Sequence, residues 1–325
     1  MRICTFLLLT VAAVRPAPAD VTRERIDRAV TRGVEFLRQQ QADDGTWAER
    51  WFLQKGGVTA LCTLALLQSG VEPTDEQVQR SLKILRTVLP KTTYVTSLQT
   101  MVLCRAKLDT DLAMIRRNVQ WLENIQVQDG PNKGAWSYPS RGTGGDKSNT
   151  RFAMLALHEA RQAGVDVSKR TWRLALRHWV ETQNADGSWS YRTDSKTMPG
   201  SGSMTCSGIA SIAMASAQLD GEDDLIASGK EPTQRAVDWL AKNFSVERNP
   251  GVDTWHFYYL HTLRSAGRLT QQTEFGRHDW YAAGADYLVR QQDMRAGWWK
   301  GRTNLETDPA VATALALLFL AEDRR

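Results

Sequence analysis

The sequence has few cysteines and lacks any block of like charge. Four cysteines occur in 325 residues, at the widely spaced positions Cys4, Cys62, Cys104 and Cys206. Spacing of this kind excludes a disulfide-rich framework. The formal net charge is +5, and no run of Lys or Arg stands out. The charge pattern therefore excludes a nucleic-acid partner.

Alternation of apolar and polar residues over the length of a strand is also missing. Val, Ile and Thr do not alternate with polar residues, and Pro and Gly fall between apolar segments with helical spacing. Hydrophobic residues make up 42% of the chain, enough for a sizeable core. The sequence predicts an all-α protein.

The first 19 residues are typical of a secretory signal peptide. Met1-Arg2 precede an apolar run from Ile3 to Val14, and Ala17-Pro18-Ala19 fits a cleavage site. The run is too short for a permanent membrane span. We expect cleavage after Ala19, which leaves residues 20–325 as one domain without a transmembrane helix, exported to the periplasm or the medium.

One motif occurs four times along the chain. Its first copy, residues 32–47, has an apolar pair near the end of a helix, then Gln41, Gly45 and Trp47. The Gln amide can serve carbonyls at the helix end, the Gly permits the turn, and the Trp closes it as an apolar cap. The other copies hold Gln126, Gly130 and Trp136; Gln183, Gly187 and Trp189; and Gln292, Gly297 and Trp299. Such recurrence predicts a repeat architecture.

Each repeat is expected to be a hairpin of two helices. The first helix carries the Gln and a charged face, so it should lie outside, and the second is apolar nearly all round, so it should be buried. The six expected hairpins are 26–41 with 58–69, 76–89 with 94–106, 112–125 with 149–163, 169–182 with 204–218, 233–244 with 254–265, and 280–292 with 309–321.

The last helix bears on whether the repeats close into a ring. Terminal repeats of an open solenoid carry a polar capping face. Residues 310–320 are instead as apolar as the central second helices. The sequence therefore favours an (α/α)6 toroid, with the last hairpin packed on the first, and the long loops 130–148, 187–203 and 220–232 decorating one face.

The Gln-to-Trp corner resembles the QW repeat of squalene-hopene cyclases and, more loosely, the repeats of protein prenyltransferase β-subunits. Residues 32–47 match at every motif position, and the resemblance covers residues 20–325. It implies a single toroid of the terpenoid cyclase and prenyltransferase superfamily, with an apolar central cavity for an isoprenoid or another hydrophobic ligand. The Asp-x-Asp-Asp acid motif of such cyclases is absent, so the sequence leaves open whether the protein is an enzyme.

The same resemblance points to candidate catalytic residues. Prenyltransferases hold zinc with Asp, Cys and His near the starts of inner helices. Here Cys206 and His256 occupy such positions, but Met204 stands where the family has its Asp, and Asp253 is the nearest substitute. Two ligands are too few for zinc, so we expect no metal or cofactor. The alternatives are a thiolate and base pair, or a buried thiol and a structural imidazole.

Candidate ligand-binding residues follow from the inner helices. Their N-termini should converge on one rim, where unpaired N–H groups favour an anion such as a diphosphate. Asn149, Arg151 and Asp308 belong to this rim, although helix capping explains such residues equally well. An aromatic cluster of Trp255, Tyr258 and Tyr259 either faces the cavity or packs in the core.

Three classes of function remain open from the sequence. The first is a toroid that binds, and in one version transforms, a hydrophobic ligand. The second is a non-catalytic scaffold for a protein partner. The third is a carbohydrate-active enzyme, which requires two carboxylates in the cavity. Asp253 and Asp308 are the only candidate pair that we identify in the sequence.

Overall fold

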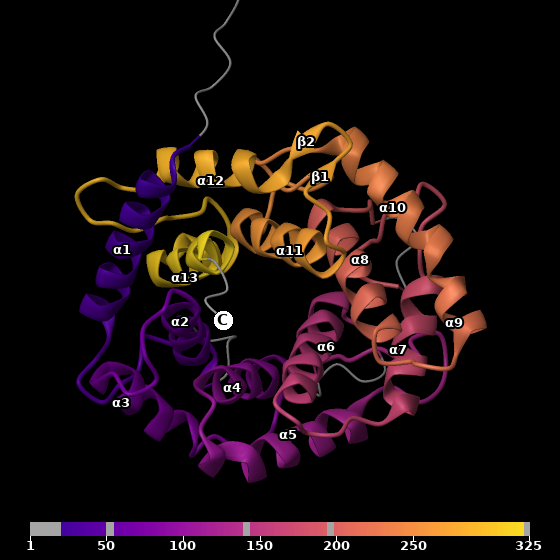
Figure 1. Ribbon diagram of the computed structural model, residues 1–325, viewed down its shortest axis with the longest axis horizontal. Coiled ribbons are helices and arrows are strands. Elements are labelled where there is room, and N and C mark those ends of the chain that lie inside the picture. The colour runs from indigo at the N-terminus through magenta and orange to yellow at the C-terminus, as the bar shows by residue number, and fades with distance from the viewer. Residues whose placement is uncertain (1–20, 50–54, 139–143, 194–197, 322–325) are drawn as a thin grey trace, which may run out of the picture.

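Two concentric rings of helices form the fold, as Figure 1 shows. The computed structural model describes residues 21–49, 55–138, 144–193 and 198–321. The outer helices are α1 (Arg23–Gln40), α3 (Glu76–Leu85), α5 (Leu112–Ile125), α7 (Lys169–Glu181), α10 (Lys230–Asn243) and α12 (Trp280–Gln291). The inner helices are α2 (Gly57–Gln68), α4 (Thr93–Ala106), α6 (Lys147–Gln162), α8 (Gly202–Ser216), α11 (His256–Leu269) and α13 (Pro309–Leu320). The prediction of an all-α (α/α)6 toroid is confirmed, while the expected signal peptide, 1–19, lies outside the described residues.

The layering follows from the distribution of apolar residues. Every residue of α2 is buried, and so are nearly all residues of α13. An outer helix such as α3 buries only one stripe, which includes Val78, Leu82 and Leu85. Helices that are apolar all round must lie inside, and helices with one apolar stripe can cover them. None of the described helices is both long and apolar enough to cross a membrane.

Short elements fill the connections. They are η1 (Asp109–Asp111), α9 (Asp223–Ser228), η3 (Asn304–Thr307) and the antiparallel pair β1 (Glu274–Phe275) and β2 (His278–Asp279). Helix α9 lies in a segment that the sequence analysis treats as a loop. Helix α11 begins two residues later than expected, because Trp255 has a left-handed backbone with φ of 59° and cannot continue a helix.

The Trp of each corner joins an outer helix to the inner helix that follows it. The Trp47 indole Nε1 donates to the Leu37 carbonyl oxygen at 2.9 Å, and its backbone N–H donates to Thr59 Oγ1 at 3.3 Å. The other three corners repeat both bonds, with Trp136 on Leu122 and Thr150, Trp189 on Trp179 and Thr205, and Trp299 on Leu288 and Thr313. The corner Trp residues are therefore structural.

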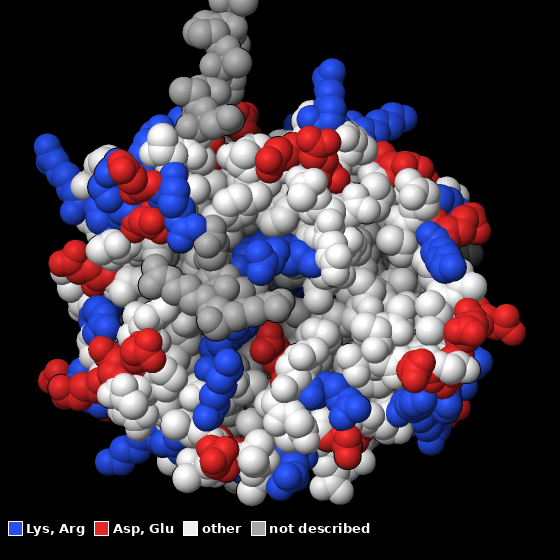
Figure 2. Space-filling view, in the orientation of Figure 1, with Lys and Arg blue, Asp and Glu red and all other residues white. Residues whose placement is uncertain are grey.

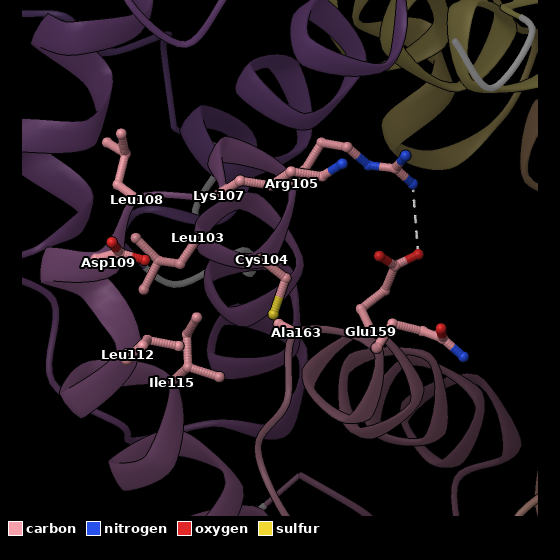
Figure 3. Close-up of a pocket in the computed structure, with 11 residues that line it drawn as sticks. Leu103, Cys104, Arg105, Lys107, Leu108, Asp109, Leu112, Ile115, Glu159 and Ala163 are labelled. Atoms are coloured by element: carbon pink, nitrogen blue, oxygen red, sulfur yellow. Dashed lines mark hydrogen bonds and ion pairs between the residues drawn. The ribbon is translucent and has the colours of Figure 1, made fainter. Parts of the chain in front are cut away.

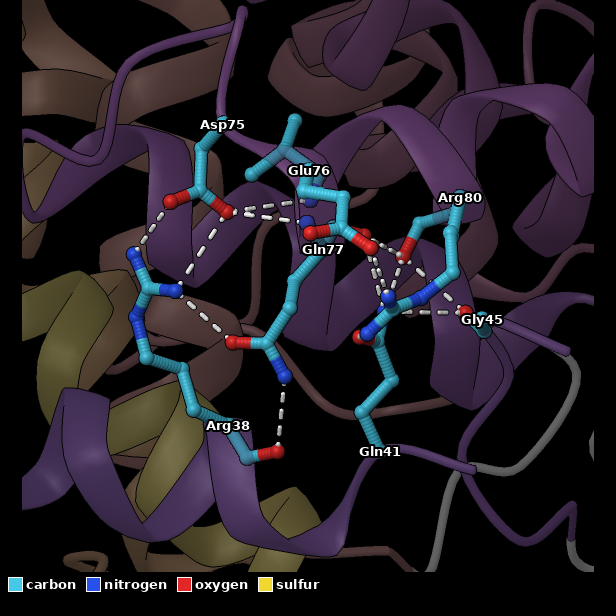
Figure 4. A network of polar contacts seen from close by, with 9 residues as sticks. Arg38, Gln41, Gly45, Asp75, Glu76, Gln77 and Arg80 are labelled. Atoms are coloured by element: carbon cyan, nitrogen blue, oxygen red, sulfur yellow. Dashed lines mark hydrogen bonds and ion pairs between the residues drawn. The ribbon is translucent and has the colours of Figure 1, made fainter. Parts of the chain in front are cut away.

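The Gln of each corner instead reaches the next outer helix. Gln41 Nε2 donates to the Gly45 carbonyl at 3.2 Å and to the Gln77 carbonyl in α3 at 2.9 Å (Figure 4). Gly45 has φ of 89°, and a Cβ there would lie 2.6 Å from the Arg80 carbonyl carbon. Gly is therefore required both by its backbone conformation and by the close approach of α3. Corresponding bonds join Gln126 to Thr171, Gln183 to Pro232 and Gln292 to Ala29.

The Gln292 corner closes the ring. Its amide donates to the Ala29 carbonyl in α1 at 2.9 Å, 263 positions away in the sequence. Helix α1 also contacts α12 and α13, and α13 contacts α2, so the first and last hairpins are neighbours (Figure 1). The last hairpin therefore packs on the first, as the apolar final helix predicts.

Candidate ligand-binding cavity

A small cavity lies on the axis of the ring, where the inner helices begin. Its volume is about 120 Å³. Aliphatic side chains of α2 and α13, among them Leu61, Val311 and Leu315, form one part of its wall. Six aromatic side chains supply most of the rest: Tyr94, Tyr138, Phe152, Tyr191, Trp255 and Tyr258. The cavity is thus predominantly apolar and aromatic.

The aromatic wall is packed in defined geometry. The ring of Tyr94 meets that of Phe152 edge-on, with centroids 4.8 Å apart, and Phe152 lies 5.9 Å from Tyr258. The Arg151 guanidinium lies 5.5 Å from the Phe152 centroid and 5.6 Å from that of Tyr258, within the range of cation–π attraction. Burial raises the pKa of Tyr94 and of Tyr258, so both phenols stay neutral.

One edge of the cavity is polar. The Tyr191 hydroxyl donates to Asp146 Oδ2 at 2.5 Å, and the Ser148 hydroxyl donates to Asp146 Oδ1 at 2.7 Å. Tyr191 and Ser148 both line the cavity. Burial and the charge of Asp146 raise the pKa of Tyr191, which keeps its proton on the phenol. With their protons donated to Asp146, the two hydroxyl oxygens can accept a hydrogen bond from a hydroxyl group of a ligand.

Carboxylates of the chain itself cap most of the converging helix N-termini. Glu49 accepts from the Val58 N–H at 3.1 Å, and Asp146 accepts from the Asn149 N–H at 2.9 Å. Glu306 accepts from the Tyr258 N–H at 2.7 Å, and Asp308 accepts from the Ala310 N–H at 2.8 Å. Burial raises the pKa of Glu306 to about 7.

The charge of this rim follows from the caps. Six helix N-termini contribute about +0.5 each, or about +3 together. Four carboxylates, with Glu306 about half protonated at neutral pH, contribute about −3.5. The two contributions nearly cancel, but the buried side chains of Lys147 and Arg151, near the start of α6, add positive charge. The N–H groups that would hold a phosphate nevertheless have carboxylate acceptors already. The rim therefore gives little support to the diphosphate site that the sequence analysis considers.

The structure places the three candidate catalytic residues in different surroundings. Cys206 is fully buried, and burial raises the pKa of its thiol, so it is no thiolate. His256 Nε2 lies 2.8 Å from the Val246 carbonyl oxygen, and its ring packs against Tyr287. Burial lowers the pKa of His256. Asp253 is exposed. Within the described ranges, no cluster of three or more His, Cys, Asp or Glu is arranged to hold a metal.

The predicted ligand-binding residues divide into two groups. Trp255 and Tyr258 line the cavity. Tyr259 does not, because its ring packs so closely on α8 that a Cβ at Gly202 would lie 2.7 Å from it. Asn149 and Arg151 are buried, and Asp308 serves as the N-cap of α13.

Four of the six aromatic residues that line the cavity were not predicted from the sequence. Tyr138 and Tyr191 end the turns Trp136-Ser137-Tyr138 and Trp189-Ser190-Tyr191, each of which begins at the Trp of a corner. The Trp of each turn is structural, whereas the Tyr two positions later faces the cavity. The repeated Trp-Ser-Tyr sequence was thus a usable signal. Tyr94 and Phe152, in α4 and α6, carried no comparable signal.

Two of the larger hollows away from the cavity lie near the C-terminal ends of inner helices. One, of about 460 Å³, is bounded by α4, α5 and α6. Figure 3 shows the Arg105–Glu159 ion pair on its wall, 3.4 Å long, beside Cys104. The other, of about 630 Å³, lies beside Arg264 and Trp280. Both have charged walls, whereas the axial cavity combines an apolar wall with few polar groups, as ligand sites generally do.

Comparisons with known proteins bear on the fold. No protein-family model matches the chain, and no curated protein sequence matches it. Among solved structures, apo type II terpene cyclase MstE from Scytonema matches with a TM-score of 0.59 and 15% identity, over 92% of this chain and 97% of that chain. The GH76A α-1,6-mannanase of Salegentibacter sp. HEL1_6 matches with a TM-score of 0.63 and 9% identity, over 91% and 100%.

A third similar structure is a possible member of the GH105 family from Salmonella enterica serovar Paratyphi A. Its TM-score is 0.63 at 11% identity, and the match covers 98% of each chain. Identities this low show the fold and not the chemistry. The chain is therefore similar in fold to (α/α)6 toroids, which include a type II terpene cyclase as well as glycoside hydrolases.

Proposed function

We propose that this protein is exported and binds a neutral hydrophobic small molecule, an isoprenoid or a compound like it, in the axial cavity. The observation that carries the proposal is the wall of six aromatic side chains around a hollow at the centre of the ring. An apolar group gains free energy when it leaves water for such a wall. Carboxylates already accept from the N–H groups at most of the converging helix N-termini, which favours a neutral ligand over a diphosphate.

The size of the cavity limits what it can enclose. A protein cavity of about 150 Å³ holds one benzene molecule. The axial cavity, at about 120 Å³, can therefore enclose one ring or one branched five-carbon unit. A longer isoprenoid would insert one end and extend through the mouth. A variant of MstE has been solved in complex with its substrate, geranylgeranyl dihydroxybenzoate, which is not named as a diphosphate.

The other two classes of function have weaker support. A glycoside hydrolase needs two carboxylates that face its substrate. Asp253 is exposed and Asp308 is occupied as a helix cap, so they do not form such a pair. A purely structural scaffold for a protein partner would have no use for the aromatic hollow. Without the acid motif of cyclases, we propose binding and no cyclisation.

The test is direct binding to the full chain. Lipid extracted from the purified protein is identified by mass spectrometry, and farnesol and farnesyl diphosphate are titrated while tryptophan fluorescence is recorded. We expect saturable binding of farnesol and at least tenfold weaker binding of the diphosphate, because carboxylates already occupy the helix N–H groups that would hold it. Absence of any extracted lipid together with no saturable farnesol binding would refute the proposal.

A cavity-filling variant locates the site. Leu315→Phe adds volume inside the hollow, and we expect it to weaken farnesol binding at least tenfold. Leu89→Phe is the matched control, since Leu89 is 61% exposed and lies outside the cavity. Equal farnesol affinity in the two variants, at equal thermal stability, would show that farnesol binds outside the axial cavity.

A further inference from the structure

Arg151 carries a positive charge into the interior of the ring. Its side chain is 0% exposed, and none of the ion pairs between described residues includes it. The guanidinium Nη2 donates to Ser265 Oγ at 2.8 Å. Its Nε and Nη1 atoms are buried without a hydrogen-bond partner of good geometry, although the Tyr258 hydroxyl lies beside the guanidinium. Two N–H donors of a buried guanidinium cation, Nε and Nη1, are therefore without a well-placed acceptor.

A second unpartnered group faces Arg151 from α11. His261 precedes Ser265 by four residues, so both side chains lie on one face of that helix. His261 Nδ1 is buried and has no hydrogen-bond partner. Burial, followed by the positive charges of Arg151 and Arg264, holds the pKa of His261 well below its ordinary value. The imidazole is thus neutral and can donate one N–H.

The third group comes from α8, which contacts both α6 and α11. Ser207 and Ser211 are four residues apart and share one face of α8. The Ser207 hydroxyl lies against that of Tyr258, which precedes His261 on α11. Ser211, one turn further along, is fully buried, and its hydroxyl has no partner.

An uncompensated buried cation is unfavourable, and the cation–π contacts of Arg151 offset only part of its desolvation. We propose that a small monovalent anion, a halide or a carboxylate group, binds in the interior between Arg151, Ser211 and His261. The anion would accept hydrogen bonds from all three residues, and those with the guanidinium would be charge-assisted. This site is distinct from the axial cavity, because Arg151 lies outside the lining of that cavity.

Access and charge agree with this assignment. His261 and Ser265 are partly exposed, so the cluster is not sealed from solvent. On the face of the ring in Figure 2, Lys or Arg side chains lie close to the centre, with an acidic side chain next to them. Arg105 and Arg264 lie near the C-terminal ends of α4 and α11, and the nearby Glu159 pairs with Arg105. An anion that enters from this side meets positive charge.

The test measures thermal stability of the full chain against anion concentration. Sodium chloride, bromide and formate are titrated at constant ionic strength, set with sodium methanesulfonate. We expect the melting temperature of the wild type to rise and saturate, as it does for a ligand that binds only the native state. Chloride and formate arms separate a halide site from a carboxylate site. No saturable response to any of the three anions would overturn the proposal.

The variants separate binding from a purely structural role. In Arg151→Met we expect the anion response to vanish, while the melting temperature without added anion is at least that of the wild type, because the buried charge is gone. Arg116→Met, on the exposed face of α5, is the control and should respond as the wild type does. An Arg151→Met variant that still responds, or one that is destabilised equally with and without anion, would contradict the site.

A measurement on the wild type covers the case in which Arg151→Met fails to fold. The pKa of His261, followed by NMR, should rise as bromide is added, because an anion stabilises the protonated imidazole. Anomalous scattering from bromide in crystals should then place the ion beside Arg151. A pKa that is unchanged by bromide, with water alone at the position, would refute the inference.

Discussion

Replacement of Gln292 by Ala tests whether the ring is closed. The Gln292 amide donates to the carbonyls of Ala29 and Gly297 at 2.9 and 2.8 Å, and its Oε1 accepts from Arg32 Nη2 at 2.6 Å. Each bond contributes about 1 kcal/mol net, and a carbonyl left buried without a partner costs about 1 to 3 kcal/mol. We therefore expect Gln292→Ala to lower the free energy of unfolding by about 3 kcal/mol.

The comparison with another corner makes the measurement decisive. Gln126 is 3% exposed and Gln292 is 4% exposed, and both donate to a turn and to the next outer helix. In a closed ring the two Ala variants should lose similar free energy in urea unfolding followed by circular dichroism, whereas Gln291→Ala, on the exposed face of α12, should lose little. In an open superhelix the terminal corner would be nearly neutral. A loss of under about 1 kcal/mol for Gln292→Ala beside a full loss for Gln126→Ala would refute closure.

Three further predictions follow from particular contacts. Gly134→Ala should lower the urea midpoint strongly, because φ is 89° and the new Cβ would lie 2.0 Å from the Leu174 carbonyl oxygen. Burial raises the pKa of Glu306 from 4.5 in the unfolded chain to about 7, so the folded state holds the proton more tightly. About 3 kcal/mol of folding stability should therefore be lost as the pH rises from about 4.5 to 7. In Glu306→Gln, the urea midpoints at pH 5 and pH 8 should differ less than they do in the wild type. The buried thiols of Cys62 and Cys206 should resist a thiol reagent in the native protein and react after unfolding, and rapid native labelling of either would contradict their burial.

Most of the fold could be predicted from local sequence patterns. The spacing of Gln41, Gly45 and Trp47 predicts a helix end, a turn and an apolar cap, and the structure has all three. The same short pattern cannot say which helix the Gln amide reaches. That partner, the Gln77 carbonyl, lies 36 residues away, and only packing brings it near.

The candidate site was less accessible to such reasoning. The apolar inner helices predicted a greasy centre, and Trp255 and Tyr258 were expected in its wall. Glu306 was missed, because it caps α11 from a segment 48 residues further along the chain. Helix caps supplied by another hairpin leave no local pattern, so the charge of the rim could not be judged from sequence.

The sequence by itself determined the number of hairpins, the division into inner and outer helices and the corner that links them, since these depend on residues a few positions apart. Only the tertiary structure decided which aromatic rings face the axis and which carboxylates cap the rim. It also decided that Arg151 lies in the interior without a counter-ion. Those features depend on side chains from different hairpins that meet at the centre of the ring, and such meetings follow from how the helices pack.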